Sequence, residues 1–152
     1  MRVFGLTIDP QTKNPIVILR EVEGATVLPV WVGAMEAMAV SLVLNKENLP
    51  RPLTHDLLLM TLKALKAGLV KVEITDLNEG VFFALLVLQG PGGRVRVDCR
   101  PSDAIALAMR AEAPIMVNED VLRRAAEAQK KAEERLHEEV LSPVPDAATE
   151  IG

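Results

Sequence analysis

The sequence predicts an α+β domain in which two sets of antiparallel strands, each a β-meander, lead into a helix. Short β-like runs occur in two groups of three, an apolar helical segment follows each group, and turn residues separate the runs. With 152 residues, 49% of them hydrophobic, the chain suits one domain with a sizeable core. Aromatic residues are only 3% of the chain, so this core must consist of Leu, Val, Ile, Ala and Met.

The first group of strands is expected at Arg2–Ile8, Pro15–Val22 and Thr26–Val32. Pro29 lies inside the third run and cannot donate a hydrogen bond to a neighbouring strand, so we expect that strand to lie at a sheet edge or to carry a bulge. A helix over Ala34–Leu44 follows, and its mostly apolar surface predicts deep burial.

The second group repeats this order after an additional helix. We expect that helix from about His55 to Ala67, with Thr54 as its N-cap. The middle strand of the second group is apolar on both faces, which is typical of a central strand. The group comprises Leu69–Leu77, Val81–Gln89, Arg94–Arg100 and a helix from Ser102 to about Ala111.

The two predicted units contain a similar segment early in the helix. Glu36-Ala37-Met38-Ala39-Val40 and Asp103-Ala104-Ile105-Ala106-Leu107 both read acid, Ala, apolar, Ala, apolar. One hypothesis is an internal duplication about a pseudo-twofold axis, which would place Glu36 and Asp103 at equivalent points. Chance similarity of five small and apolar residues is the alternative.

The chain is predicted to divide into a domain over residues 1–118, a charged helix over 119–141 and a disordered polar tail over 142–152. The charged helix carries a thin, Ala-rich stripe at spacings of three and four. That stripe predicts packing on the domain or on a partner subunit. It comprises Leu122, Ala125, Gln129, Ala132, Leu136 and Val140.

Charge and cysteine content restrict the partners and the compartment. Residues 1–118 hold 12 basic and 12 acidic side chains, whereas residues 119–152 hold 5 and 9. The chain thus lacks the basic excess usual for nucleic-acid binders, unless basic residues cluster in space or a metal ion adds positive charge. A lone Cys99, no apolar start typical of a signal peptide and no apolar run of membrane-spanning length predict a cytoplasmic protein that does not enter a membrane.

Two similar motifs carry the polar groups best suited to chemistry. In Arg51-Pro52-Leu53-Thr54-His55-Asp56, an acid/base histidine stands beside a carboxylate and an arginine at a helix start that favours anions. A structural alternative is that Thr54 caps the helix, Asp56 complements its dipole and His55 lies at the surface.

The second motif is Asp98-Cys99-Arg100-Pro101-Ser102-Asp103. Its paired carboxylates could hold a divalent metal while Arg100 binds a phosphate. Alternatively, Arg100 and Asp98, which share a strand face, form an ion pair that fixes the corner between strand and helix. Cys99 lies on the apolar side of its strand, which favours a core residue over a nucleophile.

Four blocks follow one another in the chain: Leu28-Pro29-Val30-Trp31-Val32-Gly33 with Glu36-Ala37, Arg51-Pro52-Leu53-Thr54-His55-Asp56-Leu57, Arg100-Pro101-Ser102-Asp103-Ala104-Ile105-Ala106-Leu107-Ala108, and Pro114-Ile115 with Val117. Over roughly residues 1–125, these blocks and their spacing resemble the bifunctional nuclease domain family. The sequence departs from the family pattern at two positions. Cys99 replaces a commoner alanine, and Phe83 replaces a commoner tyrosine and so lacks its hydroxyl.

The resemblance implies a nuclease that hydrolyses phosphodiester bonds of DNA and RNA, binds nucleic acid weakly and forms a homodimer or higher homo-oligomer. On this interpretation, Mg²⁺ or Mn²⁺ assists the reaction. The expected catalytic residues are His55, Asp56, Asp103 and Glu36; the expected phosphate ligands are Arg51 and Arg100; the expected metal ligands are Asp98, Asp103 and Glu36. The alternative is a non-catalytic oligomeric binding or regulatory module for an anionic ligand or a protein partner.

Overall fold

The computed structural model describes residues 1–141, in which the strands form two separate sheets. The first sheet contains β1 (Arg2–Ile8), β2 (Pro15–Arg20) and β3 (Val27–Trp31), antiparallel and in chain order. Its β3 strand pairs with β2 alone, so Pro29 lies in an edge strand as predicted.

The second sheet has the strand order β6-β5-β4-β7. It contains β4 (Gly68–Asn78), β5 (Val81–Gly90) and β6 (Gly93–Cys99), which are antiparallel, and β7 (Ile115–Val117), which runs parallel to β4. The apolar β5 strand lies between β4 and β6, which confirms its central position.

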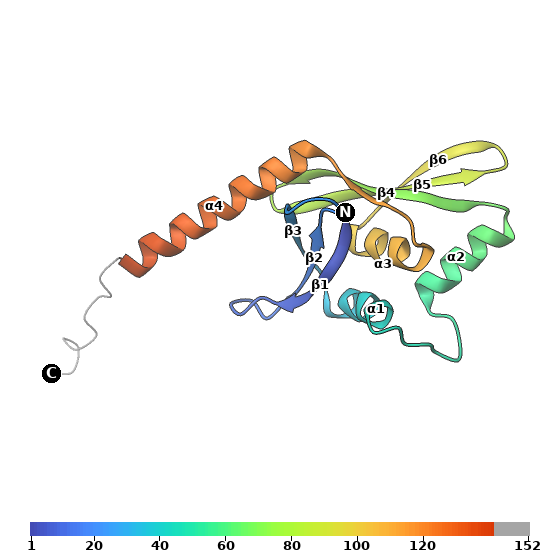
Figure 1. Cartoon of the computed structure of the whole chain (residues 1–152), viewed down its shortest axis with the longest axis horizontal. Helices are drawn as coiled ribbons and strands as arrows, with labels where there is room; N and C mark the ends of the chain where they lie inside the picture. The colour runs from blue at the N-terminus through green and yellow to red at the C-terminus, as the bar shows by residue number, and fades with distance from the viewer. Residues whose placement is uncertain (142–152) are drawn as a thin grey trace.

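The helices pack against these sheets, the last of them over only part of its length. They are α1 (Ala34–Leu44), α2 (Thr54–Ala64), α3 (Pro101–Ala111) and α4 (Glu119–Leu141). Figure 1 shows α3 in the middle, with the second sheet above it, α1 below it and α2 to one side. The five residues from Ala104 to Ala108 are almost completely buried, so α3 forms the centre of the core.

The predicted deep burial of the α1 segment is wrong. Only Val40 of this helix is buried, while Met35 and Met38 are 78% and 60% exposed. The apolar surface of α1 contacts α3 on one side and strands β1 and β2 on another. An apolar composition predicts that a helix packs against neighbours, but it does not show how many neighbours cover it.

The strands and helices repeat in the manner that the duplication hypothesis requires. In both units, three consecutive strands form an antiparallel meander in chain order, and a helix follows the third strand. Helix α1 packs against β1 and β2, and α3 packs against β4 and β5. The first strand of each unit also departs from regular pairing, with irregularities in β1 and β4.

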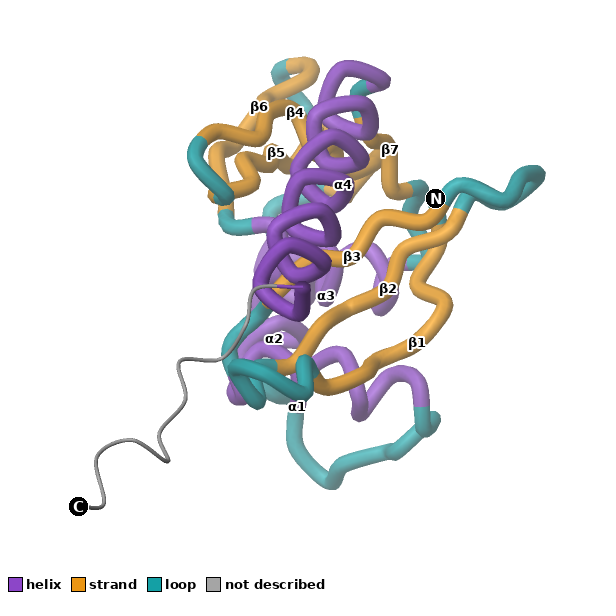
Figure 2. Tube along the Cα trace, turned by 90° about the vertical axis from the view of Figure 1, so that its left-hand side faces the viewer, coloured by secondary structure: helices purple, strands orange, loops and turns teal. Residues whose placement is uncertain are grey.

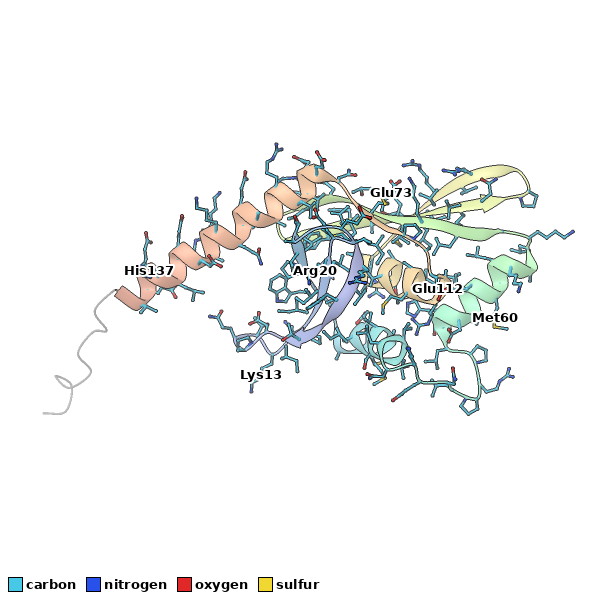
Figure 3. All side chains as sticks on the ribbon, in the orientation of Figure 1. Lys13, Arg20, Met60, Glu73, Glu112 and His137 are labelled. Atoms are coloured by element: carbon cyan, nitrogen blue, oxygen red, sulfur yellow. The ribbon has the colours of Figure 1, made fainter. Side chains whose placement is uncertain are left out.

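The α4 helix leaves the rest of the molecule along most of its length (Figure 1), and in the view of Figure 2 it lies in front of the other elements. Val121 and Ala125 are buried in the common core, and Arg124 donates to the carbonyl of Leu77 and the carboxylate of Asp76. From residue 126 to residue 140 every side chain is exposed. Figure 3 shows His137 on this outer part of the helix.

The tail expected over residues 142–152 lies outside the described residues. Among the helices of residues 1–141, none has both the length and the apolar character needed to cross a membrane.

The central position of α3 predicts where substitutions destabilise the protein most. Ile105→Ala removes a fully buried side chain and should lower the free energy of unfolding by about 2–5 kcal/mol. Met35→Ala removes a mostly exposed side chain and should change it by less than about 0.5 kcal/mol. Urea unfolding followed by circular dichroism measures both, and equal losses would contradict the central role of α3.

Candidate functional site

Three helix N-termini carry an acidic residue at the same position. Glu36, Asp56 and Asp103 are each the third residue of α1, α2 and α3, respectively. The expected N-cap Thr54 is wrong, because α2 begins one residue earlier than predicted and Leu53 takes the cap position. Helix α3 also begins one residue earlier than predicted, at Pro101. Carboxylates in the first turn are stabilised by the positive end of the helix dipole.

Asp103 is the centre of a polar cluster. Nε2 of His55 lies 3.0 Å from its Oδ1, and Nε of Arg100 lies 2.9 Å from its Oδ2. Partial burial acts to raise the pKa of Asp103, but the hydrogen bonds from Arg100 and His55 outweigh it and hold the pKa below its ordinary value. Asp103 is therefore a carboxylate at neutral pH, and His55 donates through Nε2–H.

Arg100 extends the cluster to the first unit of the fold. Its Nη1 donates to Oε1 of Glu36 at 2.8 Å, across 64 residues of sequence. The predicted pair between Arg100 and Asp98 is not formed among residues 1–141; Arg100 binds Glu36 and Asp103 instead. A Cβ at Gly33 would lie 2.3 Å from Oε2 of Glu36, so the missing side chain leaves room for this carboxylate.

Asp56 belongs to a second ion pair, in which the arginine is the buried partner. Its Oδ1 accepts from Nε of Arg110 at 3.1 Å, and its Oδ2 accepts from the backbone amide of Leu53 at 3.0 Å. Arg110 is 8% exposed and also donates to the carbonyls of Ala39 and Ala106. This arginine thus joins α1, α2 and α3. Asp56 caps α2 and also neutralises the charge of Arg110.

The remaining predicted residues line two different hollows. Asp98 lines a hollow of about 760 Å³ together with Glu36, Arg100 and Asp103. Arg51 lines a different hollow of about 530 Å³, beside Asp56 and Arg110. The structure therefore brings together Glu36, His55, Arg100 and Asp103 at a third hollow. Asp98 shares the hollow of about 760 Å³ with three of them but not with His55, and Arg51 and Asp56 line the hollow of about 530 Å³.

Cys99 also lines the larger hollow and packs against the core. Burial, followed by the negative charges of Asp103 and Asp98, raises the pKa of its thiol to about 11. The thiol stays protonated at neutral pH, in agreement with the interpretation of Cys99 as a core residue.

The carboxylates do not form a joint metal site in this arrangement. Across residues 1–141, no group of three or more His, Cys, Asp or Glu side chains is placed to hold a metal ion. Arg100 binds one oxygen of Glu36 and one oxygen of Asp103 and so holds both carboxylates on a cation of the protein itself. The roles of Glu36, Asp98 and Asp103 as metal ligands stay a prediction.

Comparison with known proteins identifies the family of this chain. Residues 17–130 match the family model described as the bifunctional nuclease domain. The chain belongs to the bifunctional nuclease domain family. Two Mycobacterium tuberculosis proteins, from strains CDC 1551 and H37Rv, are each 41% identical over 125 residues, which cover 82% of this chain and 74% of the relative. Both relatives are described as uncharacterized.

One structural residue of this bifunctional nuclease domain was missed from the sequence. Arg110 lies seven residues after Asp103, which places both side chains on the same face of α3. An arginine in an Ala-rich buried helix is a signal for a paired charge, since buried arginines need acceptors.

The lowered pKa of Asp103 predicts a pH dependence of stability. A carboxylate whose pKa is depressed by folding stabilises the protein above the ordinary Asp pKa, and this contribution disappears as the pH falls through the folded value. Asp103→Asn should therefore unfold at lower urea than wild type at about pH 7, and the difference should shrink towards about pH 2–3. Urea midpoints across this range measure the effect, and a difference independent of pH would contradict it.

Proposed function

We propose that this protein is a nuclease that hydrolyses phosphodiester bonds of DNA and RNA at the cluster of Glu36, His55, Arg100 and Asp103. The observation that carries the proposal is the hydrogen-bonded chain from His55 through Asp103 and Arg100 to Glu36, at the N-termini of three helices. Membership of the bifunctional nuclease domain family supports the same substrate class.

His55 is suited to the role of general base. With Nε2–H donating to Asp103, the lone pair of the ring lies on Nδ1, where it can accept a proton from water. Asp103 holds the ring in this tautomer and stabilises the imidazolium that forms. The water oxygen then bonds to phosphorus, the bond from phosphorus to the leaving sugar oxygen breaks, and solvent protonates that oxygen.

Arg100 is suited to binding the phosphate. Its side chain is 63% exposed, and its Nη2 has no hydrogen bond within residues 1–141. A guanidinium fixed by two carboxylates keeps a preorganised donor for the charge that develops on the phosphate oxygens. Arg51, at the neighbouring hollow, is proposed to bind another phosphate of the same nucleic-acid strand. Asp56 supports the site through Arg110.

Assistance by Mg²⁺ or Mn²⁺ is a separate part of the proposal. Oxygen ligands of the type present here suit both ions. Because Arg100 binds two of the three predicted ligands, the steps above use only protein groups and water.

The cleavage of labelled single-stranded RNA and DNA by highly purified protein tests the proposal. His55→Ala and Asp103→Asn should each lower the cleavage rate by about 10²–10⁴-fold while the protein stays folded, because the general base or its partner is lost. Lys131→Glu, on the exposed part of α4, is the matched control and should cleave as wild type does. Reactions with Mg²⁺, Mn²⁺ or EDTA test the metal.

Equal cleavage by wild type and both site variants would contradict this site. In that case the mutual pairing of Glu36, Arg100, Asp103 and His55 would favour the alternative, a non-catalytic binding or regulatory module.

We also propose that α4 packs against a second copy of the chain. The outer part of its stripe remains uncovered, with Leu136 44% and Val140 80% exposed, whereas Ala125 packs into the core. Exposed charges are complementary in an antiparallel pair, where Arg123 and Glu127 of one copy would face Glu139 and Arg135 of the other.

Sedimentation analysis of a substitution in the stripe tests this pairing. Leu136→Glu places a charge in the proposed interface and should shift the protein to a smaller species. Lys131→Glu lies on the opposite face of the helix and should leave the species unchanged. A wild-type monomer, or equal assembly of both variants, would contradict pairing through α4.

A further inference from the structure

The aromatic residues of the chain are concentrated at one place. The whole sequence contains one Trp, three Phe and no Tyr. Three of these four aromatic side chains, Trp31, Phe82 and Phe83, line the hollow of about 760 Å³ that also contains Arg100. Trp31 is 48% exposed and Phe83 is 43% exposed, although rings of this size are usually more deeply buried.

Trp31 is held at this hollow by a polar contact. Its Nε1 donates to Oδ2 of Asp9 at 3.1 Å, from the loop after β1. The indole thus has a fixed orientation at the end of the edge strand β3, and Phe83 stands on β5 in the other sheet. Both units of the fold therefore contribute an exposed aromatic ring to the same concave surface.

Resting on the proposed function, we propose that this hollow binds a nucleobase next to the phosphate held by Arg100. Aromatic rings bind the faces of bases in single-stranded nucleic acids, and they do so without requiring a particular sequence. The volume suits a ligand of nucleotide size. Arg100 lies at the same hollow with an unused donor. The base of one nucleotide can therefore contact an aromatic ring while its phosphate contacts the arginine.

The acidic lining of the hollow is compatible with such a ligand. Arg100, bound to both Glu36 and Asp103, offsets one of their two negative charges, and a nucleobase carries no charge to oppose the other. Asp98 has no hydrogen bond or ion pair within residues 1–141 and offers an acceptor for the amino group of adenine or cytosine. The base proposed for this site is therefore one that carries an exocyclic amino group.

Trp31 is the only tryptophan, so the intrinsic fluorescence of the native protein reports on this hollow alone. The probe is adenosine 3′,5′-bisphosphate, which carries a base and two phosphates but no phosphodiester bond to be cleaved. It should quench Trp31 in a saturable manner, whereas ribose 5-phosphate, which lacks the base, should not.

Substitutions at Phe83 test the stacking itself. Phe83→Ala should weaken binding of the bisphosphate by about 5- to 100-fold, and Phe83→Tyr, which keeps the ring, should retain it. Phe4→Ala removes an exposed ring that does not line the hollow and is the matched control.

Each contrary result would overturn the inference in a different way. Absent quenching, or equal quenching by ribose 5-phosphate, would show that the hollow does not take a base. A Trp31 emission that changes with protein concentration and is insensitive to the bisphosphate would show that a second copy covers the hollow. Nucleotide binding without cleavage would contradict only the proposed nuclease, and cleavage without binding here would contradict only this inference.

Discussion

The close packing of α3 is the constraint on which the rest of the structure depends. Ala104, Ala106 and Ala108 give this helix a small surface, so the second sheet and two other helices can approach it on several sides. Dense packing of this kind leaves little room for larger side chains. The charged residues near the two ends of α3 are Asp103 and Arg110. They are neutralised by the pairs that they form with α1, α2 and the loop before α3.

These edge pairs give the candidate site its character. Arg100 is anchored by two carboxylates, and His55 by one, so neither side chain has to be ordered when a ligand arrives. The cluster holds two carboxylates against one arginine, so it carries no excess of positive charge. Recognition of a polyanion then depends on a few directed donors and on apolar rings rather than on a broad basic surface.

Much of the fold is visible in the sequence because its signals are local. Alternating strands, turn residues and the repeated acid–Ala–apolar pattern predict both meanders and the helices that follow them. The sequence could not show which helix is more deeply buried. Both α1 and α3 are composed largely of apolar or small residues, and only their packing in the folded protein distinguishes them. The cluster was predicted in part. Glu36, His55, Arg100 and Asp103 do meet, but the sequence could not show that Arg100 binds Glu36, since the 64 residues between them include a helix and three strands.

The long reach of the Arg100–Glu36 contact has a consequence for synthesis of the chain. On the ribosome, the first meander and α1 emerge well before Arg100, the partner of Glu36. Arg100 lies 64 positions after Glu36 in the chain. His55 likewise precedes Asp103 by 48 residues. Domains form their non-local contacts only after both segments are available. A nascent chain therefore carries no assembled cluster until its second unit has left the exit tunnel, which separates the onset of any activity from the early folding of the first unit.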